Sequence, residues 1–89
     1  LELGHRITAL LDAPEWLGAP GQGAVAVQAR ADDAAMLETL RTLDHAETRQ
    51  AVAAERALLA ALEGGCQVPI GAATLDYAEY GLMLHTMVA

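Results

Sequence analysis

The stretch DHAETRQAVAAERALLAALE, residues 44–63, decides the fold because it is a long segment of unbroken helical periodicity. Apolar residues recur along it at the i, i+3 and i+7 spacing of one helix face: Ala51, Ala54, Leu58, Ala61 and Leu62. Asp44 can cap the first turn, and Glu47 three residues on can complete a capping box. Gly64 offers a left-handed residue directly after the last turn. The pattern predicts a helix over residues 44–63.

Beyond this helix the periodicity changes from helical to extended. Residues 72–77 and 82–88 are typical of two strands joined by the turn Ala-Glu-Tyr-Gly, and the second strand alternates between two faces. A two-stranded hairpin is only marginally stable alone, so it must pack on the helix or recruit a further strand. The predicted fold class is therefore α+β, with helices packed on a small antiparallel sheet.

Three weaker elements precede the long helix. Residues 1–11 have helical spacing, whereas Gly18–Gly23 has the composition of a loop. Residues 24–29, Ala-Val-Ala-Val-Gln-Ala, form an apolar run that predicts a strand covered on both faces. Asp32 and Asp33 can cap a short helix with the apolar set Met36, Leu37, Leu40 and Leu43.

Composition limits the function. Eighty-nine residues make at most one small domain, and 54% hydrophobic residues with a mean hydropathy of +0.27 argue against a disordered tail. A net charge of −7 argues against a surface for nucleic acid or anionic membranes, because phosphate binding needs clustered cations. No apolar run approaches the length of a membrane span. Because the first residue is not methionine and the last lies in a strand-like stretch, we expect a longer parent protein.

Cys66, the single cysteine, is the sharpest candidate for chemistry. Cys66 is either a buried, inert residue that acts as a small apolar side chain, or a functional thiol that serves as a nucleophile or as an attachment point. It follows a helix C-terminus, where the helix dipole disfavours a thiolate, so repeated nucleophilic attack is disfavoured. A permanently attached group suits the position better, since Gly65 and its neighbouring glycine let a bulky adduct lie against the backbone.

The other candidates are weaker. In the Gly18–Gly23 loop the glycines precede a strand, which excludes a dinucleotide fingerprint and leaves either a simple turn or a loop that lets a ligand reach Gln22. The adjacent Glu55 and Arg56 are interpreted as a salt-bridge couple. No metal site is predicted, because the three histidines lie on different elements without ligand spacing: His5, His45 and His85.

Three stretches in this order resemble the porphobilinogen deaminase family, also called hydroxymethylbilane synthases. They are APGQGA at 19–24, AER at 54–56 and LEGGCQVPIG at 62–71. The resemblance implies a transferase of tetrapyrrole and heme biosynthesis in the cytoplasm, which joins four porphobilinogen units into hydroxymethylbilane and releases ammonia. It also implies a dipyrromethane cofactor on Cys66 through a thioether, with Gly65 beside it, and Gln22 as a contact to cofactor or substrate.

The resemblance also implies a division of the chain. Residues 1–20 would end the second domain of the enzyme, 21–43 would form a strand and helix returning to the first, and 44–89 would form a truncated cofactor-carrying third domain. The catalytic aspartate and most substrate-binding arginines would lie outside the chain, so no catalytic residue is assigned here and the chain alone is predicted to be inactive. We expect the full-length enzyme to be monomeric and the isolated chain to self-associate.

A different hypothesis is a non-catalytic α+β interaction module on the same scaffold. Such a module would use the edge of the hairpin for pairing with a partner. It predicts that Cys66→Ala leaves partner binding and stability nearly unchanged, whereas the enzyme hypothesis predicts an adduct on this cysteine.

Overall fold

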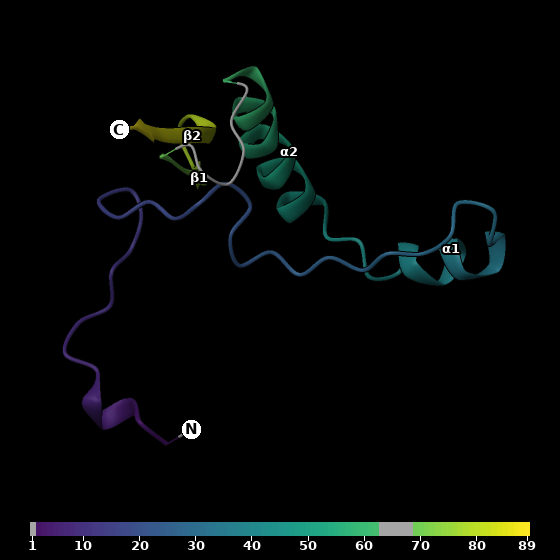
Figure 1. The fold of residues 1–89 in the computed structure, drawn as a ribbon, viewed down its shortest axis with the longest axis horizontal. Helices are drawn as coiled ribbons and strands as arrows, with labels where there is room; N and C mark the ends of the chain where they lie inside the picture. Colours follow the sequence, from purple (N-terminus) through teal and green to yellow (C-terminus); the bar gives the residue numbers. More distant parts are fainter. Residues whose placement is uncertain (1, 63–68) are drawn as a thin grey trace.

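The computed structural model describes residues 2–62 and 69–89 (Figure 1). The elements in chain order are η1 (Gly4–Arg6), α1 (Ala34–Arg41), α2 (Ala46–Ala61), β1 (Ile70–Tyr77) and β2 (Gly81–Val88). The two strands form one antiparallel sheet, and α2 packs against both of them. The predicted α+β class is confirmed.

The predicted helix over residues 44–63 is present as α2, but its cap differs from the prediction. His45 is the N-cap, because the Thr48 N–H donates to its Nδ1 at 3.3 Å. Asp44 instead forms an ion pair with Arg49, with 3.2 Å between Oδ2 and Nε. The predicted capping box of Asp44 and Glu47 is therefore wrong. Spacing alone could not decide which of two adjacent polar side chains would occupy the non-helical cap position. The predicted role of Gly64 lies outside the described residues.

The predicted hairpin is confirmed and is slightly longer than the sequence indicated. β1 and β2 pair in register from Ile70 opposite Val88 to Tyr77 opposite Gly81. Gly81 closes the turn with a φ of +72°, which glycine adopts without steric cost. The hairpin leans on α2, as a two-stranded sheet requires.

The buried centre of the described residues is small. Ile70 and Ala72 of β1 are 7% and 4% exposed, and the carboxylate residue Glu55 of α2 is 8% exposed. Leu62, predicted on the buried face of the helix, is 44% exposed, so that expectation is wrong in this structure. It follows the last turn of α2, whose contacts with the hairpin are made by the preceding turns.

The N-terminal part differs most from the predictions. The strand expected over residues 24–29 does not form, because among the described residues only β1 and β2 pair and an isolated strand has no ladder. The helix expected over residues 1–11 is reduced to η1. The helix predicted after Asp33 is confirmed as α1, since the Met36 N–H donates to Asp33 Oδ1 at 3.0 Å.

Much apolar surface is left exposed by this arrangement. Figure 1 shows η1, near the N-terminus, and α1 both lying away from the α2–hairpin unit, on two different sides of it. The radius of gyration is 16.1 Å, whereas a compact domain of this length would have about 12 Å. Exposed large apolar residues occur in the segment before α1, on α1, between α1 and α2 and on β2, among them Leu10, Met36, Leu43, Met87 and Val88.

Candidate functional site

Glu55 connects three parts of the chain at the centre of the fold. Its Oε2 accepts a hydrogen bond from the Gly21 N–H at 2.7 Å, and its Oε1 accepts one from the Thr74 N–H at 2.8 Å. Gly21 lies on the loop before α1, Glu55 on α2 and Thr74 on β1. We call these two hydrogen bonds the Glu55 bridge. A carboxylate can do this because it carries two acceptor oxygens and no donor.

The bridge covers the edge of β1 that faces away from β2. In an antiparallel ladder every second N–H of a strand points away from its partner strand. The Ala72 N–H donates to the Gly18 carbonyl at 2.9 Å, and the next outward N–H, that of Thr74, donates to Glu55. Thr74 Oγ1 also donates to the Ala51 carbonyl of α2 at 3.3 Å. These contacts give two outward N–H groups of β1 a partner without a third strand.

The segment held on this edge, residues 17–23, is the Gln22 loop. Its shape is closed internally, since the Ala19 N–H donates to Gln22 Oε1 at 2.9 Å and the Gln22 N–H donates to the Ala19 carbonyl at 3.0 Å. Gly21 and Gly23 have φ values of +74° and +84°, which an L side chain rarely adopts. The sequence left a simple turn or a ligand loop open, and this geometry is compatible with both.

The Gln22 loop approaches β1 so closely that a side chain at Gly71 would make a tight contact with it. A Cβ added to Gly71 would lie 3.0 Å from the Cβ of Leu17 and 3.6 Å from the Gly18 carbonyl oxygen. A side chain at position 71 would therefore force the loop or the strand to move slightly. The constraint on Gly71 comes from packing alone, since its φ is not positive. The loop is fixed to β1 by close packing as well as by hydrogen bonds.

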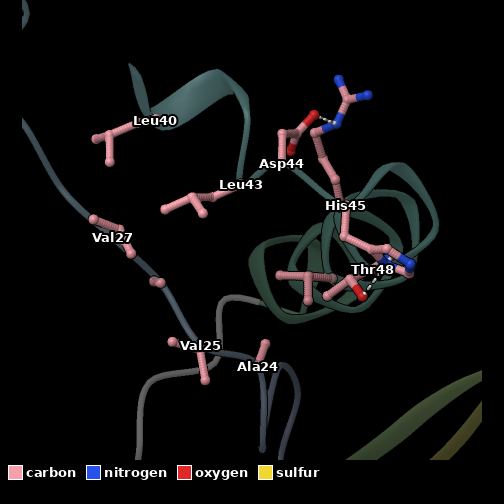
Figure 2. A pocket seen from close by; sticks show the side chains of 11 residues that line it. Ala24, Val25, Val27, Leu40, Leu43, Asp44, His45 and Thr48 are labelled. Atoms are coloured by element: carbon pink, nitrogen blue, oxygen red, sulfur yellow. Dashed lines mark hydrogen bonds and ion pairs between the residues drawn. The ribbon is translucent and has the colours of Figure 1, made fainter. Parts of the chain in front are cut away.

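A separate groove of about 290 Å³ lies between the 24–27 segment and the junction of α1 with α2 (Figure 2). One side is apolar, with Val25 and Val27 across from Leu40 and Leu43, as Figure 2 shows. The other side is polar and carries the ion pair between Asp44 and Arg49 and the contact between the N-cap His45 and Thr48. These four residues line the groove together with Val52. The single cation of the lining is thus already paired with a carboxylate.

The structure places the sequence-predicted site residues unevenly. Gln22 lies in the loop held by the Glu55 bridge, but Cys66 and Gly65 lie outside the described residues. The interpretation of Glu55 and Arg56 as a salt-bridge couple is wrong, because the carboxylate turns toward Gly21 and Thr74. Adjacent residues on a helix do not face each other, a rule that argues against such a couple from sequence alone.

Within the described residues, no group of His, Cys, Asp and Glu is arranged to hold a metal ion. His5, His45 and His85 lie on η1, at the start of α2 and on β2, respectively. His85 is occupied within the sheet, where its Nε2 lies 3.1 Å from the Tyr77 hydroxyl. No helix in residues 2–62 or 69–89 is long and apolar enough to cross a membrane.

Comparison with known proteins adds a second line of observation. Residues 49–89 match the family described as porphobilinogen deaminase, C-terminal domain. The whole chain is 60% identical over 89 residues to a porphobilinogen deaminase of Desulforudis audaxviator (strain MP104C), and covers 28% of that protein. Over 88 residues, 99% of the chain, it is 53% identical to one from Xanthomonas oryzae pv. oryzae (strain PXO99A), of which it covers 29%.

A third relative matches over a shorter stretch of the chain. Over 72 residues, 81% of the chain, it is 58% identical to a porphobilinogen deaminase of Xanthomonas campestris pv. campestris (strain B100), of which it covers 24%. The chain thus spans less than a third of the length of these curated relatives. No solved structure matches the chain.

Proposed function

Because the chain belongs to the porphobilinogen deaminase family, we propose that it is the C-terminal, cofactor-carrying part of an enzyme that joins four porphobilinogen units into hydroxymethylbilane. The observation that carries this proposal is the 60% identity to a porphobilinogen deaminase along all 89 residues. Each joining replaces the carbon–nitrogen bond of the aminomethyl group by a carbon–carbon bond, and the amine leaves as ammonia. We propose the division at 1–20, 21–43 and 44–89 as the boundaries between the parts that belong to different domains of the enzyme.

Cys66 is proposed to hold dipyrromethane through a thioether. The donor chemistry fits, since a thioether requires one thiol and Cys66 is the only cysteine of the chain. Gly65 beside it carries no side chain that would compete for the space. When bound, dipyrromethane supplies the free pyrrole carbon at which the first substrate is joined. Cys66 itself acts as a permanent tether, in keeping with its place after a helix C-terminus, where thiolate formation is disfavoured.

Gln22 is proposed to contact cofactor or substrate through its amide nitrogen. Its Oε1 accepts from the Ala19 N–H, which uses the acceptor end of the side chain and fixes its direction. The two N–H donors of the amide then remain for a ligand, and donors are what the carboxylate groups of a pyrrole substrate need. Gln22 is therefore a binding residue in this proposal, and no residue of the chain is assigned as the acid or base.

The rest of the active site is proposed to lie in the other domains of the enzyme. With five arginines against twelve acidic residues, the chain does not attract an anionic substrate. The groove of Figure 2 is not suited to bind an anionic substrate either, since its one cation, Arg49, is paired with Asp44. We therefore expect the chain alone to be inactive, and formation of bilane by the purified chain with porphobilinogen would refute this.

The test of the tether is the mass of the Cys66 peptide in the full-length enzyme. We expect this peptide to carry the mass of dipyrromethane, and we expect Cys66→Ser to lose both the adduct and the activity. An unmodified thiol in active enzyme would contradict the proposal. The interaction-module hypothesis predicts instead an unmodified Cys66 peptide, and it predicts that Cys66→Ala leaves partner binding and stability nearly unchanged. The mass of the peptide therefore separates the two hypotheses.

A further inference from the structure

We infer that Glu55 is a positioning residue that holds the Gln22 loop against the hairpin, so that Gln22 is fixed relative to the helix that leads to Cys66. The inference rests on the proposed function in one respect, the contact of Gln22 with cofactor or substrate. The Glu55 bridge itself is independent of it, since both hydrogen bonds are 2.8 Å or shorter and Glu55 is 8% exposed.

The stability of α2 alone does not require a charged side chain at Glu55, which is almost fully buried. Removing a carboxylate from water is costly unless hydrogen bonds replace those to the solvent, and here two backbone N–H groups do so without a basic side chain. Those two donors come from residues 34 positions before and 19 positions after Glu55. A residue serving only α2 would be satisfied within α2, whereas this one joins the loop to the sheet.

The Gln22 loop needs such an attachment because of its glycines. Gly18, Gly21 and Gly23 give the loop many alternative backbone conformations, and each lowers the fraction of time that Gln22 spends in one position. The bridge binds the N–H of Gly21, the residue directly before Gln22. A binding group held in one position loses less entropy when the ligand arrives, which is how positioning contributes to rate.

Glu55 also joins the Gln22 loop to the helix that precedes the proposed tether in the sequence. It lies on the third turn of α2, and Cys66 follows the same helix eleven residues after Glu55. The Glu55 carboxylate therefore fixes the position of the Gln22 loop relative to α2, the helix that precedes the proposed tether of the cofactor in the sequence. Loss of the bridge would leave the tether in place and free the loop, so the inference predicts a defect in substrate use without a defect in cofactor attachment.

The experiment uses the full-length enzyme with Glu55→Gln, which keeps the size of the side chain but turns an N–H donor toward one of the two N–H groups. Glu47→Gln is the matched control, since Glu47 is an exposed glutamate in the first turn of the same helix. Hydrogen exchange is measured on peptides covering residues 17–23 and 70–77. The mass of the Cys66 peptide and kcat/KM for porphobilinogen are measured on each variant.

In Glu55→Gln we expect the amides of Gly21 and Thr74 to exchange at least about tenfold faster, with the control within about twofold. The Cys66 adduct should remain, and kcat/KM should fall by about fivefold or more. If Glu55→Gln does not fold, Glu55→Asp replaces it, because this variant keeps two acceptors on a shorter side chain and should give a smaller defect in the same direction. Unchanged exchange at both amides would overturn the inference.

A double-mutant cycle with Gln22→Ala separates positioning from general stability. If Glu55 acts through Gln22, the double variant should be no worse than Gln22→Ala alone, within about twofold. Multiplying defects would show that Glu55 acts independently, which overturns the positioning role. If Gln22→Ala leaves kcat/KM unchanged, the proposed contact of Gln22 fails and the positioning role fails with it. The exchange data would then still decide whether the Glu55 bridge exists.

Discussion

Replacing Gly71 with alanine is expected to push the Gln22 loop away from β1 by steric contact alone. The new Cβ would lie 3.0 Å from the Cβ of Leu17, closer than ordinary van der Waals contact between carbons. Neither atom is at the end of a flexible side chain, so the backbone of the loop or of the strand must move by several tenths of an ångström. Gly71 has no positive φ, and alanine is therefore not strained for conformational reasons.

The magnitude follows from the contacts that this movement disturbs. Insertion of a methyl group into a packed contact costs about 1–3 kcal/mol. The nearest hydrogen bond is that between the Ala72 N–H and the Gly18 carbonyl, 2.9 Å long and directly beside the clash. At room temperature this cost corresponds to local opening that is about 5-fold to 160-fold more frequent, if the whole of it acts on the loop–strand contact.

Hydrogen exchange of the peptide covering residues 70–77 in the full-length protein measures this opening. Gly4→Ala is the control, because its Cβ would meet nothing within 4 Å and its φ is not positive. Leu17→Ala should not rescue Gly71→Ala, since it keeps the offending Cβ, whereas Leu17→Gly should restore much of the protection. Exchange at Ala72 within about twofold of the unaltered protein would refute the steric argument.

Three further predictions concern the exposed parts of the chain. Leu62→Ala should cost less than about 1 kcal/mol in urea denaturation of the isolated chain, because Leu62 is 44% exposed, and a loss above about 2 kcal/mol would show that the residue is buried. Asp33→Ala should lower the stability of α1 by about 1 kcal/mol through loss of the cap to the Met36 N–H, seen as lost helical circular dichroism, whereas Asp32→Ala should not. The isolated chain should sediment as oligomers, and Met83→Lys with Met87→Lys should shift it toward monomer, since both residues are exposed on β2; a monomeric unaltered chain would contradict this.

The parts of the fold that were predicted correctly depend on local patterns. The apolar periodicity of residues 44–63 predicted α2, and the change to an extended pattern, with alternation over residues 82–88, predicted the hairpin and its turn. Asp32 and Asp33 were both predicted as possible caps because an N-cap interaction spans only three residues, and the structure has Asp33 as the cap. The same locality failed at Asp44, where His45 took the cap, because two neighbouring side chains could both serve and their backbone angles decided between them.

The strand predicted over residues 24–29 shows the limit of a pattern. Its apolar composition is compatible with a buried strand, but a strand exists only through hydrogen bonds to another strand. Among the described residues none pairs with it, and Val25 is 92% exposed. The sequence could indicate that residues 24–29 tend to be extended, but it could not show whether another strand is there to pair with them.

For the candidate site, the sequence by itself identified Cys66 as the one available thiol, placed Gln22 in a glycine loop and led to the family through the motifs around both. It could not assign the role of Glu55, which it interpreted as half of a salt-bridge couple with Arg56. Gly21 and Thr74 lie 34 and 19 residues from Glu55, and no periodicity connects positions so far apart. Only the packing of α2 on the hairpin brings the N–H groups of Gly21 and Thr74 to one carboxylate. Hydrogen bonds between segments that are distant in the sequence require that the tertiary fold first place those segments side by side.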